Sequence, residues 1–149
     1  MAKAPRLKNA VRDAIKIEMG NAENLMANED YDGAVIALRA AEDLLPEPKE
    51  IYAEFQTIQL RLARAAIKNG NYTEALEHLQ RAGAGGYSLE LPVVRLMFAR
   101  CYFKTGRSDL ALREYRQARD LVSPGSDWME FFREEGEQEG VVLIQNAQE

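Results

Sequence analysis

The chain of 149 residues has the length of one ordinary domain and can bury a core without disulfide or metal cross-links. Its content of 46% hydrophobic and 29% charged residues is that of a globular protein and excludes the disordered class. A net charge of −5 argues against a general nucleic-acid binder, which carries a basic excess. The longest apolar run, VVLI at 141–144, is too short to cross a bilayer.

The first ten residues, MAKAPRLKNA, have basic side chains but no apolar block behind them, so no signal peptide is expected. Cys101 is the only cysteine, so no internal disulfide can form and nothing demands an oxidising compartment. We therefore expect a cytoplasmic protein that does not enter a membrane.

Three pairs of amphipathic segments follow one another along the chain. In each pair a periodic apolar segment, at 7–28, 48–70 and 89–106, precedes a second one, at 30–41, 71–82 and 107–118. Apolar residues recur at spacings of three and four, the periodicity of a helix with one buried face. No stretch alternates every second residue between turn signals, so no sheet is expected. The pattern predicts an all-α fold of three antiparallel helix pairs.

Small residues occupy matching places in the three pairs. The second segments align on Ala34, Ala75 and Ala111, which lie 41 and 36 residues apart. A further alanine stands seven residues after each of these, and another stands twelve residues before: Ala41, Ala82 and Ala118, and Ala22, Ala63 and Ala99. Small side chains let neighbouring helices approach closely. We expect these nine alanines to be the contacts between packed helices.

The spacing between the first two pairs is five residues longer than the spacing between the second and third. These extra residues predict a long helix over 48–69. At the C-terminus, Asp127 followed by Glu130 is a helix-start signal, and it predicts a helix that caps the third pair. Gly136 and Gly140 are expected to end that helix. VVLI at 141–144 must then be buried, either in a second short helix or in an extended arm that pairs with another chain.

These residues resemble the tetratricopeptide repeat, whose unit is a helix-turn-helix of about 34 residues. The third unit carries Phe98, Ala99, Tyr102, Gly106, Ala111, Tyr115, Ala118 and Pro124. The second unit carries Leu62, Ala63, Gly70, Tyr72, Ala75, Leu79 and Ala82. The first unit carries Ala22, Leu25, Tyr31, Ala34, Leu38, Ala41 and Pro46. The tryptophan expected early in each unit is missing, and Glu29 stands where a turn glycine is usual.

The resemblance implies one domain over residues 1–149, built as a right-handed α-solenoid. Its repeats would lie at about 15–48, 56–87 and 92–125, with the cap at 126–149. The glycine-rich stretch GAGG at 83–86 has no preceding strand and no P-loop lysine, so it predicts a loop between repeats and not a phosphate site.

Side chains with reactive chemistry are scarce. His78 is the only histidine and is expected to be partly exposed, so no pair of histidines can hold a metal. Cys101 falls in the middle of a predicted helix and predicts a packed, inert thiol. The carboxylates are scattered at helical spacings, as on solvated faces. We expect no enzyme activity, no metal and no cofactor.

In the family that the chain resembles, the first helix of each repeat lines a concave groove for peptides. The matching positions here are Lys16, Met19, Glu23, Met26, Thr57, Leu60, Arg61, Arg64, Ile67, Lys68, Val93, Leu96, Met97, Arg100, Phe103 and Lys104. Arginine and lysine side chains recur among them although the chain is acidic, so they suit an acidic, amphipathic segment. The alternative is that the basic residues only decorate helix surfaces while the apolar ones pack inside.

One subtype of the family binds the C-terminal carboxylate of heat-shock chaperones through lysine, asparagine and arginine. The matching positions hold Met19, Glu23, Arg61, Val93 and Met97, so that ligand is not expected.

The sequence thus favours a non-catalytic protein–protein interaction module: an adaptor, a small chaperone or an inhibitor. The alternative is a structural, self-associating subunit, a homodimer for example. Its groove would be filled by a second copy or by its own tail, which is both apolar and acidic from Asp127 onward. Nucleic-acid binding is the least favoured function because few exposed aromatics are expected.

Overall fold

The computed structural model describes residues 5–83 and 90–147, so most of the predicted loop at 83–86 lies outside the described residues. The chain forms two compact units, one up to Gly85 and one from Gly86. Across the described ranges all regular structure is helical, as the sequence predicts. Unit 1 contains α1 (Asn9–Ala27), α2 (Tyr31–Asp43), the short 3-10 helix η1 (Lys49–Ile51), α3 (Ala53–Lys68) and α4 (Tyr72–Gly83). Unit 2 contains α5 (Pro92–Lys104), α6 (Ser108–Leu121), α7 (Trp128–Glu134) and α8 (Gln138–Asn146).

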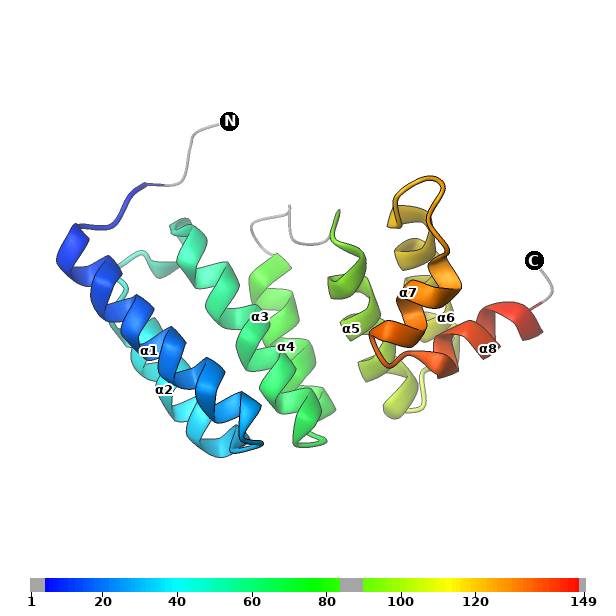
Figure 1. The fold of residues 1–149 in the computed structure, drawn as a ribbon, viewed down its shortest axis with the longest axis horizontal. Coiled ribbons are helices and arrows are strands. Elements are labelled where there is room, and N and C mark those ends of the chain that lie inside the picture. The colour runs from blue at the N-terminus through cyan, green and yellow to red at the C-terminus, as the bar shows by residue number, and fades with distance from the viewer. Residues whose placement is uncertain (1–4, 84–89, 148–149) are drawn as a thin grey trace. The chain divides into compact units, whose positions relative to one another are not determined.

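Helix pairs joined by tight turns make up both units (Figure 1). Gly70 and Gly106, with φ of 76° and 80°, follow α3 and α5 and take the left-handed conformation that ends a helix. Glu29 takes the same role after α1 with φ of 61°, without the freedom of glycine. Asp30 then caps α2, because its Oδ1 accepts a hydrogen bond of 2.9 Å from the Gly33 amide.

The nine alanines predicted at helix contacts are all buried, each with an exposed fraction of 1% or less. In unit 1 the space beside them is filled by Leu38, Ile58 and Leu62. The prediction of a long helix over 48–69 is wrong, because α3 begins only at Ala53. The additional residues form the connection between Leu44 and Tyr52, which includes η1.

A buried polar network joins three helices of unit 1. Gln59, fully buried on α3, donates a hydrogen bond to Glu42 on α2. The Oε1 of Gln59 lies 2.9 Å from Nδ1 of His78 on α4. Because an amide oxygen accepts hydrogen bonds, Nδ1 of the imidazole ring carries the hydrogen. The expectation that His78 is partly exposed is therefore wrong. Burial lowers the pKa of His78 and favours the neutral ring.

The C-terminal segment of unit 2 forms two helices. Asp127 caps α7 as predicted, through a hydrogen bond of 2.9 Å from the Met129 amide, and Gly136 with φ of 80° follows the helix. VVLI lies within α8 and is not an extended arm. Phe132, Val141 and Ile144 are buried in a cluster with core residues of α5 and α6, among them Leu96, Ala99 and Tyr115.

Gly140 does not break a helix but lies inside α8, against the ring of Tyr115. A Cβ atom at this position would lie 2.5 Å from two carbons of that ring. The glycine is thus required by close packing and not by its backbone conformation. Its place resembles that of the alanines in the other helix contacts.

Gly140→Ala should therefore destabilise the protein, although alanine favours helix. The gain in helix propensity is about 1 kcal/mol, while overpacking against the Tyr115 ring costs about 1–3 kcal/mol. Gly20→Ala in α1 is the matched control, because a Cβ there would meet no atom within 4 Å. Urea unfolding should show a lower midpoint for the first variant and an unchanged or higher one for the second. Equal stabilisation by both would contradict the packing.

Candidate functional site

The first helix of each pair in unit 1, α1 and α3, lines a hollow that is open to solvent. A cavity of about 400 Å³ lies between α1 and α3. From α1 it is lined by Arg12, Ile15, Lys16, Met19, Gly20 and Glu23, and from α3 by Ala53, Glu54, Thr57 and Arg61. Side chains three and four apart share one face of a helix, which is why these positions point together. The structure thus brings together Lys16, Met19, Glu23, Thr57 and Arg61 of the predicted groove.

The remaining predicted groove residues of unit 1 lie on the same two helices. Arg64 and Lys68 are exposed on α3, one and two turns beyond Arg61. Met26, Leu60 and Ile67 are half-buried, and Met26, like Met19, packs against the core of the unit. The apolar side chains of this face are therefore shared between the core and the hollow.

Basic side chains outnumber acidic ones around this hollow. Arg12, Lys16 and Arg61 line it together with Glu23 and Glu54. Within the described ranges, no carboxylate lies within 4.0 Å of the basic groups of these three residues, nor of Arg64 and Lys68. Two other arginines of unit 1 are paired: Arg39 lies 3.3 Å from Glu74, and Arg81 lies 3.5 Å from Glu42. The Nε of Arg12 is buried and has no hydrogen-bond partner in the described part of the chain.

In unit 2 the equivalent basic residues are neutralised by the chain's own C-terminal helix. Nη1 of Arg100 lies 3.2 Å from Glu139 and 3.6 Å from Glu137, and Nζ of Lys104 lies 3.6 Å from Glu139. Leu96 is 2% exposed and belongs to the core, and Phe103 packs against the same cluster. Val93 and Met97 are half-buried. The acidic tail thus covers part of the α5 face that the sequence assigned to a groove.

Glu137 is the most unusual carboxylate of this contact. It is 4% exposed and accepts a hydrogen bond of 2.7 Å from the Tyr115 hydroxyl. Burial raises the pKa of Glu137 to about 7, although Tyr115 and Arg100 stabilise the charged carboxylate and lower the pKa. Burial also raises the pKa of Tyr115. It raises the pKa of the Cys101 thiol to about 12, and the thiol therefore stays protonated. The buried sulfur is thus poorly suited to act as a nucleophile.

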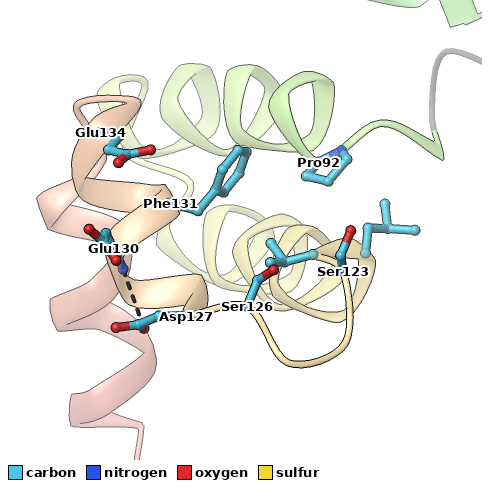
Figure 2. A pocket seen from close by; sticks show the side chains of 9 residues that line it. Pro92, Ser123, Ser126, Asp127, Glu130, Phe131 and Glu134 are labelled. Atoms are coloured by element: carbon cyan, nitrogen blue, oxygen red, sulfur yellow. Dashed lines mark hydrogen bonds between the residues drawn. The ribbon is translucent and has the colours of Figure 1, made fainter.

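A second cavity, of about 520 Å³, lies in unit 2 between the start of α5, the end of α6 and α7 (Figure 2). Asp127, Glu130, Glu134 and the ring of Phe131 line it. Sequence reasoning did not single out this place. The Asp127 carboxylate caps α7, and its hydrogen bond with the Glu130 amide is drawn in Figure 2. The Asp127 carboxylate therefore has a structural role at the start of α7.

Within residues 5–83 and 90–147 no three His, Cys, Asp or Glu side chains are arranged to hold a metal ion. A helix long and apolar enough to span a membrane is likewise not found among them.

Similarity to solved structures supports the fold. No protein-family model and no curated protein sequence matches the chain. The chain is similar to the Yersinia enterocolitica type III secretion chaperone SycD in complex with a peptide of the translocator YopD. The TM-score is 0.70 at 14% identity, over 91% of this chain and 96% of that one. Another SycD structure, described as a translocator chaperone, gives 0.71 at 14% identity, over 97% and 90%.

The N-terminal domain of stress-induced protein-1 from C. elegans gives a TM-score of 0.63 at 15% identity. This match covers 87% of the chain and 99% of that domain. At such identities the likeness concerns the fold alone. The helix pairs of this chain fit an arrangement like that of tetratricopeptide repeats.

Glu137→Gln should change how stability depends on pH. The folded state raises the pKa of Glu137, so the stability that this group contributes is fully present below its ordinary pKa of 4.5. It is lost as the pH rises through about 7. The neutral glutamine avoids this loss, so the variant should gain about 1–3 kcal/mol relative to wild type between pH 5 and pH 8. Urea unfolding at both pH values measures the change, and Glu135→Gln, at an exposed site, is the control. If the unfolding free energies of Glu137→Gln and wild type differed by the same amount at pH 5 and pH 8, the raised pKa of Glu137 would be contradicted.

Proposed function

We propose that this chain is a non-catalytic protein-interaction module, an adaptor, small chaperone or inhibitor, that binds a segment of another protein. In this proposal it has three tandem tetratricopeptide repeats at about 15–48, 56–87 and 92–125, in a right-handed solenoid, with a cap at 126–149. The likeness to SycD with a bound translocator peptide supports it, since that fold accommodates a peptide. The single buried cysteine is compatible with a cytoplasmic location, which we also propose.

The observation that carries the proposal is the unneutralised basic face beside the hollow of unit 1. Ile15 and Met19 line the hollow with apolar surface, and Arg61 stands at its edge with Arg64 and Lys68 along the same helix. Apolar surface gives a segment affinity, while arginine forks select carboxylates. The proposed partner is therefore an acidic, amphipathic segment, and no cofactor, nucleic acid or membrane is required.

The alternative, a groove filled by the chain's own tail, has support in unit 2 alone. There Glu139 lies against Arg100 and Lys104. The hollow between α1 and α3 is open within unit 1. We therefore place partner binding on unit 1 and regard the tail as the cover of α5.

The proposal is tested with peptides selected from a random displayed library on the full chain. Selected peptides should be rich in Asp and Glu and contain an apolar anchor. The double variant Arg61→Glu and Arg64→Glu should bind them at least about tenfold more weakly, equivalent to about 1.4 kcal/mol. Fluorescence polarisation at two salt concentrations measures the affinity, and the salt dependence should fall in the variant.

Arg113→Glu with Arg133→Glu is the matched control, because it makes the same change of charge at exposed sites of unit 2. Circular dichroism verifies that each variant keeps its helices. Peptides that bind the groove variant as tightly as wild type would refute the site. A selection that yields no binder would refute the proposed function itself.

A further inference from the structure

The cavity of unit 2 between the start of α5, the end of α6 and α7 has both apolar and acidic walls (Figure 2). Its volume of about 520 Å³ lies within the range of about 300–1,000 Å³ that is usual for ligand sites. Every residue that lines it belongs to unit 2, whereas the proposed peptide site lies between α1 and α3 of unit 1. The two places are therefore separate.

The apolar wall of this cavity is formed by Pro92, Leu121, Val122 and Phe131. Leu121, the last residue of α6, is 38% exposed. The ring of Phe131 projects from α7 toward α5 in Figure 2, and it is half-buried because it also packs against Phe132. A partner that covers Leu121 and Phe131 removes apolar surface from water and gains affinity.

The charges at the cavity are all of one sign. Asp127, Glu130 and Glu134 line it, and no lysine or arginine is among the described residues that do. Within residues 5–83 and 90–147, no basic group lies within 4.0 Å of these three carboxylates. Asp127 caps α7, but the carboxylates of Glu130 and Glu134 make no hydrogen bond in the described part of the chain. Their charges are thus available to a partner.

These acidic side chains form a stripe along α7. Glu130 lies three residues after Asp127 and four residues before Glu134, and residues at such spacings share one face of a helix. Phe131 stands on the same stripe, four residues after Asp127. At a rise of 1.5 Å per residue the stripe extends over about 10 Å, so it can pair with several cations of one segment.

The contact between α5 and α8 in the same unit shows which chemistry complements such a stripe. On α5, Arg100 and Lys104 lie four residues apart, and both pair with Glu139 of α8. Val141 and Ile144 of α8 are buried in a cluster with core residues of α5 and α6. A basic helix face is thus held by an acidic and apolar one. The acidic and apolar face of α7 has the same chemistry as α8, but in the described residues no basic group is paired with its carboxylates.

We propose that this cavity is a second docking site, which binds a basic amphipathic helix of a partner protein. Lysine or arginine side chains of that helix pair with Glu130 and Glu134, and its apolar side chains cover Leu121 and Phe131. A cation over the Phe131 ring adds a cation–π attraction. The partner has the opposite charge to the segment proposed for unit 1, so the failure of either proposal leaves the other standing.

The probe is a helix-forming peptide of about 15 residues, with lysines three and four residues apart and leucines beside them on one face. Fluorescence polarisation measures its affinity for the full chain, and amide chemical shifts of the isotope-labelled chain locate it. The shifts should change over the end of α6 and over α7. Glu130→Lys with Glu134→Lys should bind the peptide at least about tenfold more weakly, because the lysines then face cations. Leu121→Ala should also weaken binding, because apolar contact is lost.

Asp109→Lys with Glu135→Lys is the matched control, because it makes the same change of charge at exposed sites of unit 2 away from the cavity. Asp109 lies in the first turn of α6 as Glu130 does in that of α7, and Glu135 follows Glu134. This variant should bind the peptide like wild type. Circular dichroism verifies that the helices persist, and Glu130→Gln with Glu134→Gln replaces the lysine pair if they do not.

Four results would overturn the proposal. The first two are a wild type that does not bind the peptide, and binding that is equally tight in wild type and in the Glu130 and Glu134 variant. In the third, the control variant loses the peptide as well, so net charge and not this cavity controls binding. In the fourth, an equal concentration of spermine displaces the peptide, which would assign the cavity to a small amine.

Discussion

Close contact between helices at alanine-sized side chains is the constraint on which both units depend. Helices pack at the short end of the usual range of about 8–10 Å only where no large side chain separates them. The nine alanines at these contacts are almost completely buried, and Gly140 provides a similar contact for α8. With the helix contacts fixed in this way, the remaining faces of the first helices are left for the core, the hollow or solvent.

Spacing along the sequence was sufficient to predict the helix pairs, because small residues at fixed intervals can satisfy few other structures. It could not predict the connection between Leu44 and Tyr52, since an insertion lengthens a helix or a loop with equal ease. The burial of His78 depends on Gln59, which comes from a different helix and has no signal within the local sequence. The place of Gly140 inside α8 follows from the Tyr115 ring, again a contact between distant residues.

The sequence predicted some residues of the candidate site and missed others, as it did for the fold. Helical spacing placed Lys16, Met19 and Arg61 on faces that meet at one hollow, but it did not select Arg12 or Ala53. Arg12 lies four residues before Lys16 on the same stripe, and this was the signal that could have found it. The acidic and apolar tail from Asp127 onward was predicted as one alternative occupant of the whole groove, not of the α5 face in particular. Its register, with Glu139 between Arg100 and Lys104, required the folded position of α8.

The contact made by α8 also indicates how an acidic segment is held on such a face. Glu139 and its partners are partly exposed, and ion pairs of this kind contribute about 0–1 kcal/mol. Burial of Val141 and Ile144 of α8 contributes about 1.5–3 kcal/mol for each side chain and is the larger effect. The charges therefore select and orient the segment, while apolar burial holds it. By the same reasoning, a partner on unit 1 would gain affinity from the hollow beside Ile15 and Met19, and Arg61 would decide which segments are accepted.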